Sequence, residues 1–337
     1  YKTVTDGKGA SIKGFDITKK SGLITILNNR EITTTSSKTE EWNVTVTFVN
    51  YNSNQAGNAG KNFSAKLMIQ QESQSNQSLA DYVISRYTGT QGDNALYYHT
   101  STLDNGAGDN SYRYAGASDS VNNYICLGSD SATCPDANLF RIIGVFGEQV
   151  KVIRAKSVGN KQWHSSQDNT WLSSSLNTYL NGEYLTSLGT IADKIATTTW
   201  KVGGGSWDNI GTSVPKTAYQ YEVGSSASTT TVDKKIGLMY VTDYYYSASP
   251  SAWTLVGYNE SDATKDYIAA KTTNWLFLGS AEWTISRISD DTSTAFLVYS
   301  AGDVDYNTVT DSYAARPSFN LESSVKYVSG SGSMSDP

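Results

Sequence analysis

Charged residues are scarce in this chain of 337 residues. Lys, Arg, Asp and Glu together make up 17% of it, against about a quarter in an average soluble protein. Acidic residues outnumber basic ones, so the formal net charge is −6 and the pI is about 5.0. A nucleic-acid partner needs a basic face that neutralises phosphates, so we expect no nucleic acid among the partners. The 23 Tyr, the 28 Gly and many hydroxyl and amide side chains replace the missing charges, a composition common in exported proteins.

Long apolar runs are also missing. No stretch of about 18 apolar residues occurs, so we expect no membrane span in this chain. The first residues, Tyr1, Lys2 and Thr3, lack the basic and apolar regions of a signal peptide. We therefore expect either a cytosolic protein or a processed form whose leader or anchor preceded Tyr1. Hydrophobic residues still make up 38%, enough for real cores, and the length suits two domains.

Cysteine and histidine occur only twice each, which limits nucleophilic and metal chemistry. Cys126 and Cys134 enclose a polar loop, and two thiols so close oxidise readily outside the cell, so a disulfide is favoured over two free thiols. The short loop would make its contribution to stability roughly 2–3 kcal/mol. Neither His99 nor His164 adjoins the cysteines in sequence, so we expect no metal site there. Isolated histidines in aromatic surroundings are more often packed or solvated than catalytic.

Acidic residues near the C-terminal end are the remaining candidates for catalysis. Asp290 with Asp291, or Asp303 with Asp305, could form the carboxylate pair of a glycosidase, but acidic residues in turns are usually just solvated. Asp303, Asp305 and Asp311 could offer oxygen ligands to calcium, but the twelve-residue loop with its terminal Glu is absent. We therefore expect no catalytic residue, no metal and no cofactor.

Residues 1–72 are predicted to form a β-rich unit. Residues 42–49 alternate apolar and polar side chains, as a half-buried strand does, and residues 23–27 and 63–69 are further strand candidates. This pattern predicts a small antiparallel β-sandwich that serves as a stalk or assembly module. Residues 73–95 are predicted as a linker and a short helix with Ser78 as its N-cap.

Residues 96–337 mix strand and helix signals and are predicted to form an α+β domain. Residues 139–146 and 149–154 fit a hairpin across a Gly147-Glu148 turn. A helix is predicted from residue 170 to Asn181-Gly182, and a strand at 236–241. Residues 203–233 are predicted as a loop, whose triple glycine lacks the Lys-Ser or Lys-Thr of a phosphate-binding loop.

The segment 282–321 places apolar anchors at short intervals, with polar residues between them. We expect the anchors to be structural: Trp283, Ala295, Phe296, Val298, Gly302, Arg316, Pro317 and Phe319. The polar positions between them suit a binding face, because Tyr adds a hydroxyl to a large rigid contact area. The candidate ligand-binding residues are Trp283, Arg287, Ile288, Asp290, Asp291, Thr292, Thr294, Tyr299, Asp303, Asp305, Tyr306, Thr308, Thr310 and Tyr313.

The region from about Tyr97 to the end resembles a domain of unknown function that is widespread in exported and surface proteins of gut Gram-positive bacteria. The resemblance rests on residues 96–99, 111–114, 123–128, 139–146, 171–181 and 315–319. It covers about two-thirds of the chain. Members often carry a membrane-anchoring or prepilin-like leader, so the resemblance implies an extracellular or cell-surface location.

The final stretch also resembles the C-type-lectin-like fold of variable proteins from diversity-generating retroelements. Trp283, residues 295–298, Gly302 and Arg316-Pro317 match the scaffold of those proteins, in which exposed polar positions vary. The formylglycine-generating enzyme shares this fold, but its chemistry uses two cysteines late in the fold. Both cysteines lie early here, so the resemblance does not imply an enzyme.

Together these observations predict an α+β protein with an N-terminal β-sandwich-like domain and a C-type-lectin-like (formylglycine-generating-enzyme-like) domain. The predicted function is adhesin-type or receptor-type binding, through a diversified polar-aromatic face, of a protein or glycan on a host or bacterial surface. The lectin calcium motifs Glu-Pro-Asn and Trp-Asn-Asp are absent, which favours a protein ligand. The alternatives are a pilus or fibre subunit that self-assembles through its N-terminal domain, and an enzyme of the formylglycine-generating-enzyme-like fold.

Overall fold

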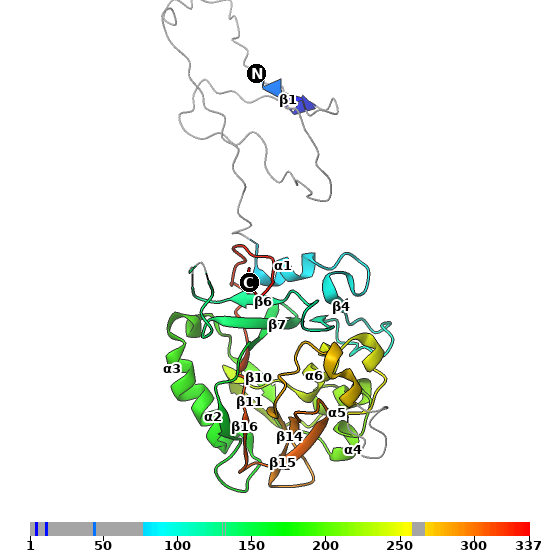
Figure 1. Ribbon diagram of the computed structural model, residues 1–337, viewed down its shortest axis with the longest axis vertical. Coiled ribbons are helices and arrows are strands. Elements are labelled where there is room, and N and C mark those ends of the chain that lie inside the picture. The colour runs from blue at the N-terminus through cyan, green and yellow to red at the C-terminus, as the bar shows by residue number, and fades with distance from the viewer. Residues whose placement is uncertain are drawn as a thin grey trace, which may run out of the picture. The chain divides into compact units, whose positions relative to one another are not determined.

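Figure 1 shows the computed structural model of the protein. The structure describes residues 77–129, 131, 133–257 and 267–337, and the backbone at 4–5, 11–12 and 43–44. The chain divides into two compact units, Tyr1–Ser73 and Gln74–Pro337. Each unit is described below by itself.

In its few described residues, the first unit contains three short antiparallel strands. They are β1 (Val4–Thr5), β2 (Ser11–Ile12) and β3 (Asn43–Val44), in the order β2-β1-β3. β3 falls inside the strand predicted at 42–49. The strands predicted at 23–27 and 63–69, and the sandwich built from them, lie outside the described residues.

The larger sheet of the second unit follows the order β12-β17-β8-β7-β5-β4, with β6 also paired to β7. Its strands are β4 (Leu96–Tyr98), β5 (Tyr112–Tyr114), β6 (Tyr124–Cys126), β7 (Leu139–Phe146), β8 (Gln149–Arg154), β12 (Ile236–Gly237) and β17 (Ser318–Asn320). β7 and β8 form the predicted hairpin, in which Phe146 pairs with Gln149 and Gly147 takes a φ of 63°. A Cβ on Gly144 would lie 2.2 Å from the Tyr112 carbonyl oxygen, so glycine permits the close approach of β5 to β7.

The second sheet has the strand order β15-β14-β13-β16-β9. Its strands are β9 (Asn160–Gln162), β13 (Glu282–Arg287), β14 (Thr294–Val298), β15 (Val304–Thr308) and β16 (Ser312–Ala314). β13, β14 and β15 pair antiparallel, while β16 joins β13 in parallel and β9 antiparallel. A separate ribbon pairs β10 (Thr198–Lys201) with β11 (Thr231–Lys234).

Short helices connect these strands. They are α1 (Leu79–Ser85), η2 (Asp93–Ala95), η3 (Trp171–Ser173), α2 (Ser175–Tyr179), η4 (Leu180–Tyr184), α3 (Leu185–Ser187), η5 (Gly189–Lys194), α4 (Trp207–Ile210), α5 (Pro215–Glu222), α6 (Val241–Ser247), η6 (Pro250–Ala252) and η7 (Tyr267–Thr273). Ser78 is the N-cap of α1, as predicted, and its hydroxyl accepts a hydrogen bond from the Asp81 N–H at 3.0 Å. In the described part of the chain, no helix is long and apolar enough to cross a membrane. The mixture of helices and antiparallel sheets confirms the α+β class.

The first and last described segments of the second unit lie side by side. The Tyr327 N–H donates to the Gln77 carbonyl, and Ser78 bridges to Lys326 in antiparallel fashion. Figure 1 draws α1, β6 and the C-terminus at this end of the unit, and β14, β15 and β16 toward the opposite end.

The helix predicted to end at Asn181-Gly182 continues beyond that point. It widens into the π-helical turn η4 and runs on through α3. The Asn181 side chain does not end the helix, because it bonds to both backbone groups of Ile236 on β12, at 2.8 and 3.0 Å. Leu172, in the first turn of the predicted helix, is 58% exposed on η3.

The predicted loop at 203–233 contains two helices and a strand, so this prediction was wrong. Ser206 caps α4 by accepting from the Asn209 N–H, and Pro215 occupies the first turn of α5. Both signals are in the sequence, but α5 is mostly polar, with Ala218 as its buried apolar residue after Pro215. Its hydrophobic periodicity is therefore weak.

The predicted strand at 236–241 was also too long. β12 ends at Gly237, and α6 begins at Val241. Every residue of α6 is buried, because the helix contacts β5 of the larger sheet and β13 and β14 of the smaller one. A helix that is buried all round has no amphipathic period, so the hydrophobic pattern did not indicate α6. One hydrophobic core joins both sheets around it.

Candidate functional site

β13 and β14 form a buried scaffold beneath the predicted binding segment. The side chains of β14 are buried except that of Thr294, as are Glu282 to Ser286 on β13. The Arg316 guanidinium holds Glu282 through two hydrogen bonds of 2.7 Å and donates a third to the Leu276 carbonyl. Burial raises the pKa of Glu282, and the adjacent Arg316 opposes that shift. The anchors of the segment 282–321 therefore lie in the interior. Arg316 of the closing Arg-Pro forms a buried ion pair with Glu282.

Three predicted binding residues belong to this scaffold and not to a surface. The Trp283 indole is fully buried, donates to the Lys161 carbonyl at 2.9 Å and packs edge-on against Tyr313. Ile288 is 4% exposed and Asp303 is 5% exposed. Burial removes all three from the predicted face, because a ligand at the surface cannot reach them.

Four loops meet at one end of the smaller sheet and form what we call the loop face: residues 164–170, 203–206, 288–294 and 308–311. Backbone hydrogen bonds join them. Ser289 donates to Gly205, Val309 donates to Ser293, and His164 donates to Val309. The triple glycine belongs to this junction, because a Cβ on Gly204 would lie 1.9 Å from the Arg287 carbonyl oxygen.

Asn169 is the residue that fixes the loop face. It is 1% exposed, and its Nδ2 atom lies 2.7 to 2.9 Å from the carbonyl oxygens of Ile288, Asp291 and Thr294. Its backbone N–H donates to Thr292, and its Oδ1 accepts from Arg287 at 3.2 Å. Sequence reasoning missed this residue, because an Asn in a polar stretch carries no motif.

The exposed side chains of the loop face are polar, and the charged ones among them are Asp290, Asp291 and Asp311. Asp290, Asp291 and Thr292 are exposed, while Arg287 is half-buried and donates to the Gly203 carbonyl. Hydrogen bonds from the Ser293 N–H and hydroxyl lower the pKa of Asp291. Asp291 thereby shapes the tip of the loop while its carboxylate stays charged.

The remaining candidates divide between the two faces of the sheet. Strand residues alternate in direction, so Tyr306 points away from its neighbours Asp305 and Asn307. Tyr306 is 43% exposed and packs edge-on against Trp207 of α4, which also stacks on the buried Phe296. Three further candidates are half-buried, namely Thr294, Thr308 and Thr310.

Asn307 joins two predicted tyrosines on the other side of the sheet. Its Nδ2 donates to the Tyr313 hydroxyl at 2.6 Å and to the Tyr299 hydroxyl at 3.3 Å. Burial, followed by the neighbouring Tyr299 and Asp311, raises the pKa of Tyr313. The structure brings Tyr299 and Tyr313 together but separates them from Tyr306. Asn307 was missed, although a period of two along β15 would have indicated it.

No metal centre is formed in the described part of the chain, where no group of three or more His, Cys, Asp or Glu side chains could hold an ion. His99 is buried against Tyr246 and Trp253, at ring distances of 4.9 and 5.1 Å. His164 is 7% exposed and accepts a hydrogen bond from the Ser166 N–H. Both histidines therefore lie in packed positions.

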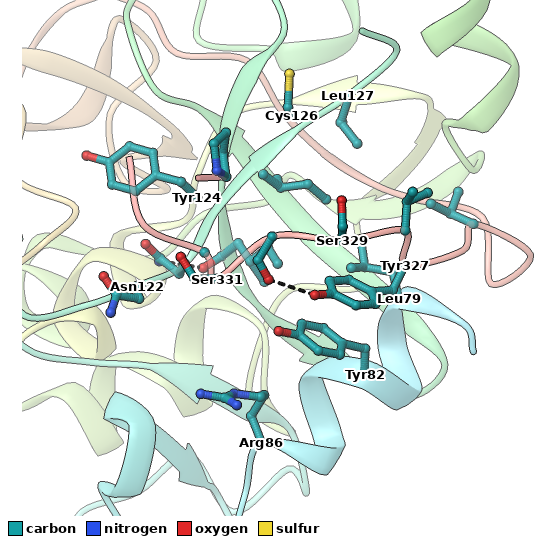
Figure 2. Close-up of a pocket in the computed structure, with 18 of the residues that line it drawn as sticks. Leu79, Tyr82, Arg86, Asn122, Tyr124, Cys126, Leu127, Tyr327, Ser329 and Ser331 are labelled. Carbon is teal, nitrogen blue, oxygen red and sulfur yellow. Dashed lines mark hydrogen bonds between the residues drawn. The ribbon is translucent and has the colours of Figure 1, made fainter. Parts of the chain in front are cut away.

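We consider two cavities in the described part of the second unit. The first, of about 110 Å³, lies between α1, β6 and the C-terminal tail. Figure 2 shows Tyr82 beside Tyr327, whose hydroxyl donates to the Gly330 carbonyl. The second, of about 430 Å³, is lined by Arg154, Tyr184, Asn138 and neighbouring serine and aliphatic side chains. Among the described residues that line either cavity there is no Asp, Glu or His, so these residues offer no side-chain general base of these types.

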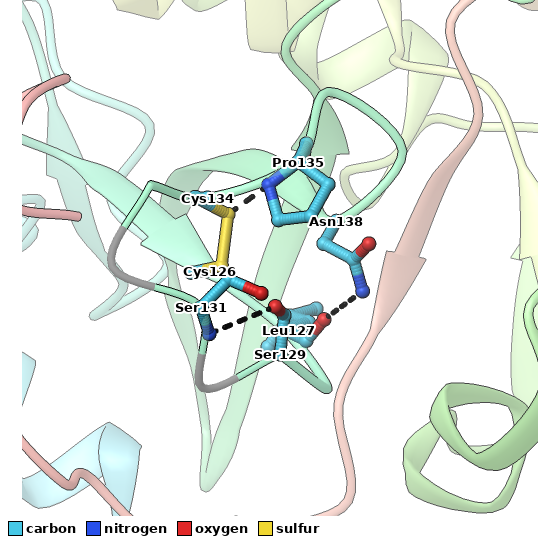
Figure 3. Close-up of a disulfide and its surroundings, with 7 residues drawn as sticks. All are labelled: Cys126, Leu127, Ser129, Ser131, Cys134, Pro135 and Asn138. Atoms are coloured by element: carbon cyan, nitrogen blue, oxygen red, sulfur yellow. Dashed lines mark hydrogen bonds between the residues drawn. A yellow bond between two sulfur atoms is a disulfide. The ribbon is translucent and has the colours of Figure 1, made fainter.

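The predicted disulfide is present. Cys126 and Cys134 are joined, and Figure 3 shows the bond closing a small loop. Asn138, which follows this loop, donates to the Leu127 carbonyl inside it at 2.6 Å. The bond fixes the segment between β6 and β7, on the larger sheet. It lies outside the loop face.

Comparison with known proteins identifies a family for this chain but indicates no activity. A family model described as "Domain of unknown function (DUF6273)" matches residues 147–323, which is more than half of the chain. The chain belongs to the DUF6273 family. No curated protein and no solved structure is detectably similar to it. The DUF6273 match runs from β8 to just beyond β17, so it contains all four loops of the loop face and leaves out the disulfide.

Proposed function

We propose that the second unit binds a ligand through its loop face, as an adhesin-type or receptor-type protein at the bacterial surface or outside the cell. The observation that carries this proposal is the contrast between scaffold and loops. Buried anchors on β13 and β14 support exposed Asp290, Asp291 and Thr292, which the scaffold does not need for packing. Binding residues commonly lie on loops that a rigid framework positions.

The position of the loop face supports display. The loop face gathers at the end of the smaller sheet, whereas Gln77 and Tyr327 lie side by side where the second unit begins and ends. Figure 1 places β14, β15 and β16 toward the end opposite α1 and the C-terminus. A unit attached through residues that precede Gln77 would therefore leave its loops accessible.

The resemblance to C-type-lectin-like variable proteins gives this proposal its finer form. On this hypothesis the second unit has the C-type-lectin-like fold, and the first unit is a β-sandwich stalk. Diversified positions would be confined to exposed side chains, namely Asp290, Asp291, Thr292 and Tyr306, because changes at buried anchors would disrupt the core. The disulfide supports an oxidising location. A protein or a glycan on a host or bacterial surface remains the proposed ligand.

The test is a binding screen of the labelled full-length protein on a glycan array and on an array of extracellular proteins. The loop-face variant carries Asp290→Ala and Thr292→Ala. The matched control carries Asp119→Ala and Thr90→Ala, an exposed Asp and an exposed Thr outside the loop face. We expect the loop-face variant to bind each captured ligand about tenfold or more weakly, which corresponds to one contact worth about 1.4 kcal/mol. Equal binding by both variants would remove the loop face as the site.

A further inference from the structure

Lys151 and Asp243 form a buried pair that the loop face does not use. Lys151 projects from β8, and Asp243 lies in the first turn of α6, 92 residues further along the chain. The lysine Nζ lies 2.5 Å from the aspartate Oδ2, and the two side chains are 6% and 3% exposed. Asp243 Oδ2 also accepts the Tyr240 N–H at 2.8 Å, so two donors hold this oxygen in place.

Aromatic rings surround the Lys151 amine. The ring centroids of Tyr240, Trp200 and Phe146 lie 4.5, 5.3 and 5.8 Å from Nζ. Among the residues that the structure describes, Asp243 is the sole hydrogen-bond acceptor of Nζ. Such burial is costly for an ammonium ion, and it lowers the pKa of Lys151 although Asp243 opposes the shift. A desolvated lysine amine is a nucleophile.

We propose that Lys151 and Asp243 join as an amide between Nζ and Cγ, a covalent cross-link formed within the folded chain. A proton first passes from Nζ to Oδ2 along the short hydrogen bond, which leaves a neutral amine facing a neutral carboxyl group. The amine then forms the N–C bond, and the Cγ–Oδ2 bond breaks. A second proton from Nζ joins Oδ2, which departs as water. Two hydrogens and one oxygen leave in total, so no oxidant, reductant or activating reagent is needed.

Arg113 is placed to assist this step. Its NH1 atom lies 3.7 Å from Asp243 Oδ1, the oxygen that gains negative charge when the amine adds. The guanidinium is 4% exposed and is held by Asp109 at 2.6 Å and by the Ser111 hydroxyl at 2.8 Å. A fixed cation beside a developing oxyanion lowers the barrier to addition. The product is a neutral amide, so the reaction also removes a buried ion pair from between β8 and α6.

A surface pair in the same chain provides the contrast. Lys156 Nζ lies 2.6 Å from Asp136 Oδ2, but these side chains are 57% and 61% exposed. Water solvates both groups there and screens their attraction, so the cross-link is expected at Lys151 and not at Lys156.

The experiment is the intact mass of the full-length protein, measured after denaturation and after reduction of the disulfide. The expected mass is lower than the sequence mass by one water, and fragmentation finds the peptides that contain Lys151 and Asp243 joined. Lys151→Arg and Asp243→Ala restore the full mass of each variant, whereas Lys156→Arg keeps the deficit. A wild-type mass equal to the sequence mass overturns the proposal, as does a deficit located at any other residue. If the core variants fail to fold, the mass and the fragments of the wild-type protein alone decide between these outcomes.

Discussion

At the scale of single residues, Asn169 connects the scaffold with the proposed function. The Nδ2 atom of this buried amide lies within hydrogen-bond distance of three carbonyl oxygens of the segment 288–294, which share its two hydrogens, and its Oδ1 accepts from Arg287. A loop tied at so many points presents its exposed side chains in one arrangement. Preorganisation of this kind reduces the entropy that binding would otherwise cost.

Asn169→Ala should therefore weaken both stability and binding. The change leaves three carbonyls without their donor, so we expect the free energy of unfolding to fall by about 2–3 kcal/mol. Urea denaturation measures this loss, and hydrogen exchange should show faster exchange in residues 288–294. Leu172→Ala, at a nearby exposed side chain, serves as the control and should leave both values unchanged. Unchanged exchange in Asn169→Ala would mean that the loop holds its shape without this residue.

His99 leads to a prediction about pH. Its Nδ1 accepts the Ala107 N–H at 3.1 Å. Burial, followed by the cation of Arg113, holds its pKa well below the ordinary 6.5, although Asp109 acts in the opposite direction. Below pH 6.5, His99 binds a proton in the unfolded chain but stays neutral in the folded chain until the pH reaches its lower folded pKa. This contribution to stability is thus complete above the ordinary pKa and is lost as the pH falls toward the folded value.

Wild-type protein should accordingly lose stability relative to His99→Gln below about pH 6.5, with a difference in slope approaching about 1.4 kcal/mol per pH unit. Denaturant unfolding of both proteins between about pH 8 and about pH 5 measures this difference, because a histidine side chain ordinarily changes its charge in this pH range. Taking the difference removes the effect of the other titrating groups. Parallel curves for the two proteins would show that His99 becomes protonated in the folded state.

At the scale of elements, β15 is an edge strand whose outward donors are already occupied. The Val304 N–H donates to the Gly257 carbonyl. The Tyr306 and Thr308 N–H groups donate to the side chains of the preceding residues, Asp305 and Asn307, at 2.8 and 2.7 Å. Unpaired N–H and C=O groups on an edge strand can form hydrogen bonds with a strand of another chain. Here the edge is blocked by side chains of the strand itself, which argues against fibre assembly through β15.

Replacing both caps, as Asp305→Ala with Asn307→Ala, should make the protein self-associate. Two N–H groups would then be free to pair with another strand, and we expect the scattering mass to rise with concentration. Tyr313→Phe is the matched control, because it removes a partner of Asn307 but leaves both caps in place. A double variant that stays monomeric like wild type would show that the caps do not protect the edge.

The same elements show what the sequence could reveal. The hairpin at Gly147-Glu148 and the Ser78 cap depend on local signals, and both were predicted correctly. α6 could not be predicted, since it is buried between two sheets and its apolar residues follow no period.

The candidate site was also only partly predictable from the sequence. The exposed loop at 290–292 followed from polarity, but the burial of Trp283 and Ile288 depends on how β13 and the loop after it pack in the interior, where Glu282 to Ser286 are all buried. Asn169 acts on a loop more than a hundred residues away, which no local pattern encodes.

At the scale of the whole molecule, the chain divides into Tyr1–Ser73 and Gln74–Pro337, and the two proposed roles fall in different units. Every residue of the loop face and its support lies in the second unit. The self-association expected from the sequence was assigned to the first. Ligand binding and assembly should therefore be separable by cutting the chain between the units.

Limited proteolysis of the full chain is the corresponding test. The polar segment Ser73–Ser78 is the predicted linker, so cleavage there should release a stable fragment that starts close to Gln74. We expect this fragment to keep the affinity of the full chain for any ligand captured in the screen, because Asn169, Arg287 and the loop 288–294 stay together. Light scattering should find the fragment monomeric even where the full chain forms filaments. Loss of binding on cleavage would place part of the ligand site in the first 73 residues, and filaments formed by the fragment would move assembly into the second unit.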